Sequence, residues 1–258
     1  MEEPIPPQLP KTPNPPAMSL PARLFNIWAA PGDVFDEIKS AKPATANWLV
    51  PVLLSCVVGM ISVLVIFSQP GVLQQMKEKQ EEQLDKLVAS GKLNAEAKTK
   101  AQEGIESFGM TVIKISGAIG AVVASFAWVL VAAAVLKLLG SSMLKAAFSF
   151  SKALEVAGLA AMVSLLGGII QTLLVVATGS MFVSAGPALL ISNFNPANKT
   201  HLLMGTINVM TLWYLAVLGL GLAKISGTTA AKPVLCLVAL WLVLRAGIIF
   251  SGLGASGM

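Results

Sequence analysis

The sequence predicts an all-α integral membrane protein, a bundle of five transmembrane helices. Hydrophobic residues make up 55% of its 258 residues and charged residues only 12%, whereas a soluble domain carries roughly 25% charged residues. The apolar residues gather in five runs, each long enough to cross a hydrocarbon core of about 30 Å. The polar stretches around these runs predict N-terminal interfacial amphipathic turns and one helical hairpin outside the membrane.

Residues 1–18 predict a disordered, proline-rich tail. Eight prolines fall within residues 1–21 among few apolar side chains, and such a composition favours extended chain and cannot build a core. A linker is preferred over a docking peptide, because the stretch lacks aromatic residues. A cleavable signal peptide is not expected, since the first apolar run begins only after about 47 residues.

Residues 19–47 predict an interfacial segment of two short amphipathic helical turns. Apolar side chains recur there at roughly helical spacing around a break at Pro31 and Gly32. Aromatic rings favour the boundary between headgroups and hydrocarbon, so the turns are expected to lie on the membrane. The candidate interfacial anchors are Phe25, Trp28, Phe35 and Trp48.

The membrane domain is expected over residues 48–252, followed by a short tail at 253–258. Residues 181–191 are apolar but short and are interrupted by Gly186 and Pro187, so a surface or re-entrant segment is preferred there over a sixth span. The five spans are predicted at about 48–68, 111–139, 153–178, 202–223 and 234–251.

Residues 69–108 predict the helical hairpin between the first two spans. An apolar stripe follows its first half, and a break at Ser90 and Gly91 with a cap at Asn94 starts the second. Mixed glutamates and lysines indicate a solvated face. The stripe must therefore rest on the twin helix or on a partner.

Loop charges predict a cytosolic N-terminus and an outer C-terminus, in a bacterial inner (cytoplasmic) membrane. Lysines flank the joints that follow the second and fourth spans, whereas the joint between the third and fourth spans offers only Lys199. Six lysines in the hairpin oppose this orientation when counted alone, but seven acids accompany them. The hairpin is therefore expected on the outer side.

Arg245 is the one strongly charged residue well inside a predicted span, and such a residue is a functional hypothesis by default. A rise of about 1.5 Å per residue puts Arg245, Gln171 and Asn208 roughly 10 Å below the outer surface, as a candidate intramembrane polar cluster. Glu155 lies on the order of 15 to 20 Å from Arg245 in depth, so an ion pair is not expected. Polar packing between helices is the preferred role; a ligand or lipid-headgroup site and snorkelling to headgroups are the alternatives.

No catalytic, cofactor or metal site is recognisable, and the protein is expected not to be an enzyme. His201 is the only histidine, and Cys56 and Cys236 lie in apolar runs as small hydrophobic residues. The sequence has no phosphate-binding loop, nucleophile elbow or suitably paired carboxylates. It also lacks the dense basic patch of a nucleic-acid binder.

Several segments resemble the Yip domain family, the Ypt/Rab-interacting integral membrane proteins and their prokaryotic relatives. The resembling segments are LFNIWAAPGDVFDEIK, NWLVPVLL, VLKLLGSSMLKAAFSFSKALEVAGLAAM and LWYLAVLGLGLAKISGTTAAKPVL, which cover most of residues 24–250. The resemblance implies five spans with a cytosolic N-terminus. Eukaryotic relatives commonly carry an acidic DLYGP-like element where this chain has SAKPATANW, so the chain resembles the prokaryotic branch and binding to a Rab-type GTPase is not supported.

The leading hypothesis is a non-enzymatic membrane protein that organises membrane lipids or partner proteins, in membrane trafficking or homeostasis by resemblance. A homo-oligomer is one form that such a partner could take. The alternative is a transporter or permease component whose polar cavity is lined by Arg245, Gln171 and Asn208. A membrane-embedded enzyme is disfavoured because nucleophile and base pairs are missing.

Overall fold

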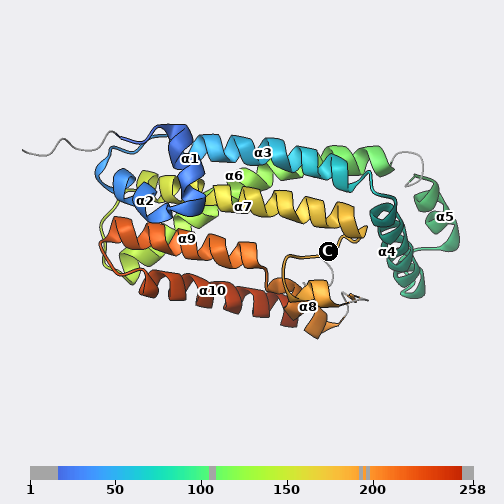
Figure 1. Ribbon diagram of the computed structural model, residues 1–258. Coiled ribbons are helices and arrows are strands. Elements are labelled where there is room, and N and C mark those ends of the chain that lie inside the picture. Colours follow the sequence, from blue (N-terminus) through green and yellow to red (C-terminus); the bar gives the residue numbers. More distant parts are fainter. Residues whose placement is uncertain (1–16, 105–108, 192–193, 196–197, 252–258) are drawn as a thin grey trace, which may run out of the picture.

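Five long helices lie side by side in the computed structural model of the chain (Figure 1). Each is long and apolar enough to cross a membrane, which confirms the all-α bundle of five spans. The structure describes residues 17–104, 109–191, 194–195 and 198–251, so most of the predicted tail at 1–18 and all of that at 253–258 fall outside it. The spans are α3 (Ala46–Ile66), α6 (Met110–Ser142), α7 (Phe150–Thr178), α9 (Val209–Ser226) and α10 (Ala231–Phe250).

The central helix of the bundle is α7, which contacts α3, α6 and α9. Its N-terminal half is buried almost continuously from Lys152 to Val163. Small residues make this possible, because they let helix backbones approach closely where lipid provides no hydrophobic drive between helices. At Gly158 the approach is so close that an added Cβ would lie 2.2 Å from the Cα of Trp48 on α3.

Two short helices, α1 (Leu20–Ala29) and α2 (Pro31–Ser40), cover one end of the bundle, which we call the α1–α2 end (Figure 1). Pro31 separates them and starts α2, as the sequence predicts. Their apolar face rests on α7 and α9 instead of on lipid: Ile27, Val34 and Ile38 are completely buried. Helical periodicity identifies an apolar face but does not distinguish a lipid surface from a protein surface beneath it.

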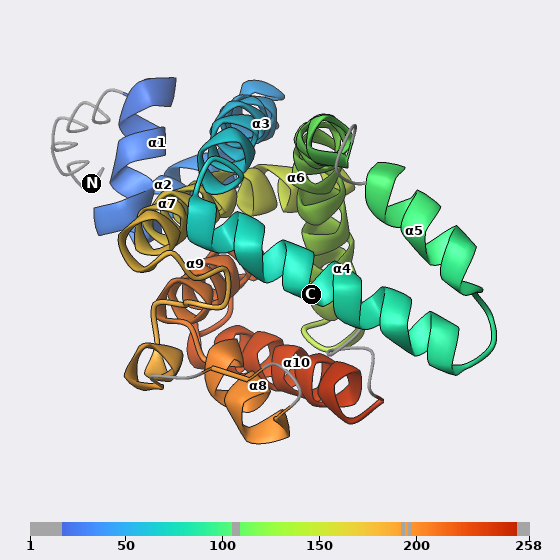
Figure 2. The ribbon, with the colours of Figure 1, turned by 90° about the vertical axis from the view of Figure 1, so that its right-hand side faces the viewer.

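The opposite end, the hairpin end, carries α4 (Pro70–Ala89) and α5 (Ala95–Gly104), which form the predicted hairpin. The turn between them has the expected signals: Gly91 has a φ of +70°, and the Asn94 side chain accepts a hydrogen bond of 2.7 Å from the Ala97 amide. Figure 2 shows α4 lying across the end of the bundle, with α5 beside it.

The first turns of α4 are attached to the C-terminal end of α7. Val72 is completely buried against Val175 and Val183, so part of the apolar stripe rests on the bundle. The Gln75 side chain donates a hydrogen bond of 3.0 Å to the Gly179 carbonyl and accepts one of 3.2 Å from the Met181 amide. These contacts fix the first turns of α4 to the bundle.

Replacing Val72 with alanine is expected to loosen this attachment. The change removes two buried carbons, worth about 1.6 kcal/mol at roughly 0.8 kcal/mol each. Hydrogen–deuterium exchange should show faster exchange of amides 70–80 with the five spans unchanged. Leu87→Ala on the same helix is the control, since Leu87 is exposed; equal effects of the two substitutions would contradict the attachment.

The joint between the third and fourth spans differs from its prediction. The predicted span 202–223 combines part of a separate short helix, α8 (Lys199–Thr206), with α9, which begins only at Val209. Asn208 is extended and its side chain accepts a hydrogen bond of 2.8 Å from the Met210 amide, because asparagine favours a helix N-cap over a helix interior. Residues 181–191 contain one short 3-10 helix, Pro187–Leu190, and no span.

Candidate functional site

The polar cluster predicted inside the membrane is not assembled. Gln171 donates its side-chain amide to the Val183 carbonyl and so fastens the loop that follows α7. Asn208 caps α9. Arg245 is exposed on α10, and within the described residues no hydrogen bond joins it to either of the others. Two of the three predicted residues therefore have structural roles, and Arg245 stands apart.

A different set of polar residues meets at the α1–α2 end, around the buried carboxylate of Glu155. This side chain is 1% exposed. Its Oε1 accepts hydrogen bonds of 2.8 Å from the Ala44 amide and 2.7 Å from the Asn47 side chain. Its Oε2 lies 2.7 Å from Lys152 Nζ, which also donates to the Ile38 carbonyl. The Lys152–Glu155 pair thus connects α7 with α2, α3 and the joint between them.

The same contacts continue outward to α1. The side-chain oxygen of Asn47, Oδ1, accepts a hydrogen bond of 3.1 Å from the Arg23 guanidinium. Arg23 in turn forms an ion pair of 2.8 Å with Glu37 on α2, and Glu37 accepts a further bond of 2.9 Å from the Met18 amide. We call the five side chains that share these contacts the α1–α2 polar network. They are Arg23, Glu37, Asn47, Lys152 and Glu155.

The network is electrically balanced, with two cations and two carboxylates. This balance matters because taking a single charge out of water costs several kcal/mol unless a partner and hydrogen bonds compensate it. Both oxygens of the Glu155 carboxylate accept hydrogen bonds from the surrounding donors. Such an arrangement holds α1, α2 and the start of α3 in one position against α7.

Reasoning from the sequence did not find this network. The positive-inside rule explains lysine residues near span ends as topology signals, and the depth of Glu155 predicts no ion pair with Arg245. A signal was nevertheless present, because Lys152 and Glu155 are three residues apart and so lie on one helix face. Asn47 is also a polar residue in the first turn of an apolar helix, and such a residue usually has a polar partner.

In the comparison with protein families, the chain matches the Yip1 domain over residues 25–253. This chain belongs to the Yip1 domain family. The resemblance noted from the sequence is therefore confirmed, and the chain is a multi-pass integral membrane protein of that family. No curated protein matches the chain, and no solved structure matches it.

The Yip1 domain includes the second half of α1 and all of α2, where three of the four predicted interfacial anchors lie. Phe25 is 66% exposed. Trp28 is half-buried and donates its indole N–H to the Met162 carbonyl at 3.0 Å, and Trp48 is half-buried beside Gly158. Phe35 requires a correction: it is completely buried, because its ring fills the space left by Gly221 on α9.

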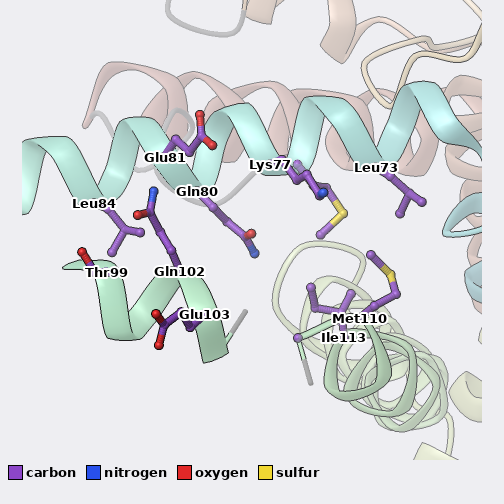
Figure 3. A pocket seen from close by; sticks show the side chains of 12 residues that line it. Leu73, Lys77, Gln80, Glu81, Leu84, Thr99, Gln102, Glu103, Met110 and Ile113 are labelled. Atoms are coloured by element: carbon purple, nitrogen blue, oxygen red, sulfur yellow. The ribbon is translucent and has the colours of Figure 1, made fainter. Parts of the chain in front are cut away.

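A second feature of this Yip1-domain chain is a cavity of about 640 Å³ between the hairpin and the start of α6. Figure 3 shows its walls: Leu73 lies with Met110 and Ile113 on one side, and Gln80 and Gln102 lie on the other. The cavity is therefore amphipathic and lies at the hairpin end. Its polar wall also carries charges, from Lys77, Glu81 and Glu103.

Three ion pairs lie on the hairpin, Lys86–Glu82, Lys98–Asp85 and Lys100–Glu96. The Lys86 ammonium, 2.6 Å from Glu82, hydrogen-bonds that carboxyl and lowers its pKa. Partial burial near the Phe182 ring lowers the pKa of Lys79. The part of the chain that the structure describes contains no group of three or more metal-ligating side chains.

Proposed function

We propose that this Yip1-domain protein is a non-enzymatic membrane scaffold that organises membrane lipids or partner proteins, in membrane trafficking or homeostasis. The observation that carries the proposal is the α1–α2 polar network. The charged groups of this network hold α1 and α2 against the spans. The outer surface of these two helices is therefore rigid, as a docking surface on a scaffold should be. Phe25 and Asp36 lie on the exposed side of that surface.

The charges near this end favour a cytosolic position for it. Several lysines belong to the joints and helix ends there, and positive residues favour the cytosolic side of a membrane. The hairpin and its amphipathic cavity would then lie on the outer side, in a bacterial inner membrane. The lysines concerned are Lys39, Lys42, Lys137, Lys145, Lys224 and Lys232.

The transporter alternative depends on a polar cavity lined by Arg245, Gln171 and Asn208, and two of these side chains have other partners. Gln171 and Asn208 are engaged by the backbone. A groove that the described residues of the spans form has almost wholly apolar walls, with Tyr214 as its one polar side chain other than tryptophan. An aqueous path for a solute needs polar groups along its length, and the geometry favours packing surfaces instead.

Photo-crosslinking from α1 tests the scaffold. A photoreactive amino acid at Phe25 in the full-length protein, in native membranes, should give adducts of defined mass with a partner protein or one lipid class. The same amino acid at Ile27 is the control, because that position is completely buried and should crosslink only within the chain.

Two outcomes would overturn the scaffold proposal. One is that Phe25 gives only the adducts expected from random contact with bulk lipid. The other is solute flux in proteoliposomes that disappears in a folded Gln171→Ala variant, which would support the transporter.

A further inference from the structure

An apolar groove runs along the bundle between α6 and α10, with α9 as its floor. Tyr214, Leu215 and Leu218 on α9 are buried beneath it, while Val131 on α6 and Leu244 on α10 border it and are more than half exposed. Its volume is about 150 Å³. Figure 2 shows α6 and α10 on either side of α9, separated from each other. The remaining residues that line it are Trp128, Ala132, Val135, Leu237, Leu240 and Trp241.

Arg245 lies at the end of this groove that faces the hairpin end. On α10 it directly follows Leu244, the last residue that lines the groove, and it lies four residues beyond Trp241. Residues four apart on a helix are neighbours, roughly 5–6 Å between Cβ atoms. Five residues separate Arg245 from the end of α10 at Phe250, which places it about 8 Å from that end.

No described residue supplies a counter-charge to this arginine. Arg245 has no hydrogen bond or ion pair among the described residues, and positions 156–258 contain no aspartate or glutamate. The only acid in any of the five spans is Glu155, which is buried and paired with Lys152 at the opposite end. An arginine at this depth is expensive unless an anion meets it.

We propose that the groove and Arg245 form one binding site for a phospholipid, in the leaflet at the hairpin end. The guanidinium binds the phosphate of the lipid, because its planar set of N–H donors matches phosphate oxygens. One acyl chain lies in the groove against Trp128, Leu215 and Leu240. The inference rests on the lipid-organising side of the proposed function and names the lipid chemistry and the residues involved.

A second copy of the chain fits this site less well. A protein occupant would have to bring an acid to the depth of Arg245, and the spans of this chain have none to offer except the buried Glu155. A phospholipid supplies both required features, an anionic phosphate at the boundary and an apolar chain directed into the membrane. The charge and the shape of the site therefore select the same ligand.

Native mass spectrometry of the full-length protein in detergent, titrated with phosphatidylglycerol, tests the site. Arg245→Gln should weaken binding about 10- to 100-fold, the range expected for losing charge-assisted hydrogen bonds. Val131→Trp should also weaken it, because the larger ring at an exposed edge closes the groove and leaves Arg245 in place. Lys92→Gln removes one exposed positive charge from the hairpin turn and should leave binding unchanged.

Three results would overturn the site. If Arg245→Gln binds phosphatidylglycerol as tightly as the wild type does, the guanidinium does not bind the phosphate. If Arg245→Gln weakens binding but Val131→Trp does not, the acyl chain does not lie in the groove. Loss of a dimer, instead of lipid, in Arg245→Gln would identify a second copy as the occupant. Each variant must elute as the wild-type protein does in size-exclusion chromatography. Adducts at Phe25 should be unchanged in all of them, so failure of this site is distinguishable from failure of the scaffold.

Discussion

Replacing Glu155 with alanine is expected to lower the free energy of unfolding by about 3–5 kcal/mol, the cost of breaking a buried ion pair from one side. The substitution leaves Lys152 buried without its counter-charge and removes the acceptor for the Ala44 amide and the Asn47 side chain. Thermal unfolding of the purified protein in detergent should show a large decrease in the midpoint. Exchange of amides in α1 and α2 should accelerate most, since the network attaches those helices.

Two further variants separate charge from hydrogen bonding. Glu155→Gln keeps a carbonyl oxygen for Asn47 but leaves Lys152 unpaired, so it should also be destabilising. Combining it with Lys152→Met removes the uncompensated charge and should recover part of the loss. Glu96→Gln is the control, because the Lys100–Glu96 pair is exposed and such pairs contribute little. Equal stability of Glu155→Ala and wild type would show that the network does not hold α1 and α2.

Adding a single methyl group at Gly158 is expected to cost about 1–3 kcal/mol, as overpacking of a filled interior does. The new Cβ would lie 2.2 Å from the Cα of Trp48 and 3.1 Å from the Asn47 carbonyl oxygen. Both are backbone atoms, so α3 must move away from α7 to make room. The movement would also disturb Asn47, which belongs to the α1–α2 polar network.

Gly168 on the same helix is the matched control. An added Cβ there meets nothing within 4 Å, so Gly168→Ala should cause no loss of stability and should follow the general preference of helices for alanine. Unfolding midpoints of the two variants in the same detergent give the comparison. Similar midpoints for Gly158→Ala and Gly168→Ala would contradict the close contact between α3 and α7.

The spans and the hairpin could be predicted because each depends on a local pattern. A run of about 20 apolar residues indicates a membrane helix without any knowledge of its neighbours. Gly91 and Asn94 likewise indicate a turn from the local sequence alone. The sequence predicts too early a start for α9, because residues 202–223 are apolar enough to form one continuous run. The preference of Asn208 for a helix N-cap decided the boundary.

The packing of the helices was not predictable in the same way. Phe35 is a surface anchor or a core residue depending on whether lipid or Gly221 lies beneath it, and the sequence pattern is the same in both cases. Asn47 and Glu155 are 108 residues apart, so only the three-dimensional arrangement shows that they meet. The rise per residue predicts a similar depth for Arg245, Gln171 and Asn208. Equal depth, however, does not put side chains on facing helix surfaces.

The two ends of the bundle are connected through one rigid element. Lys152 and Glu155 on the first turns of α7 hold α1 and α2, and the residues at its other end hold α4 through Val72 and Gln75. A continuous helix of 29 residues is about 43 Å long, which is long enough to reach from one membrane surface to the other. A displacement of α7 along its axis would therefore be transmitted mechanically to the attached elements on both surfaces at once.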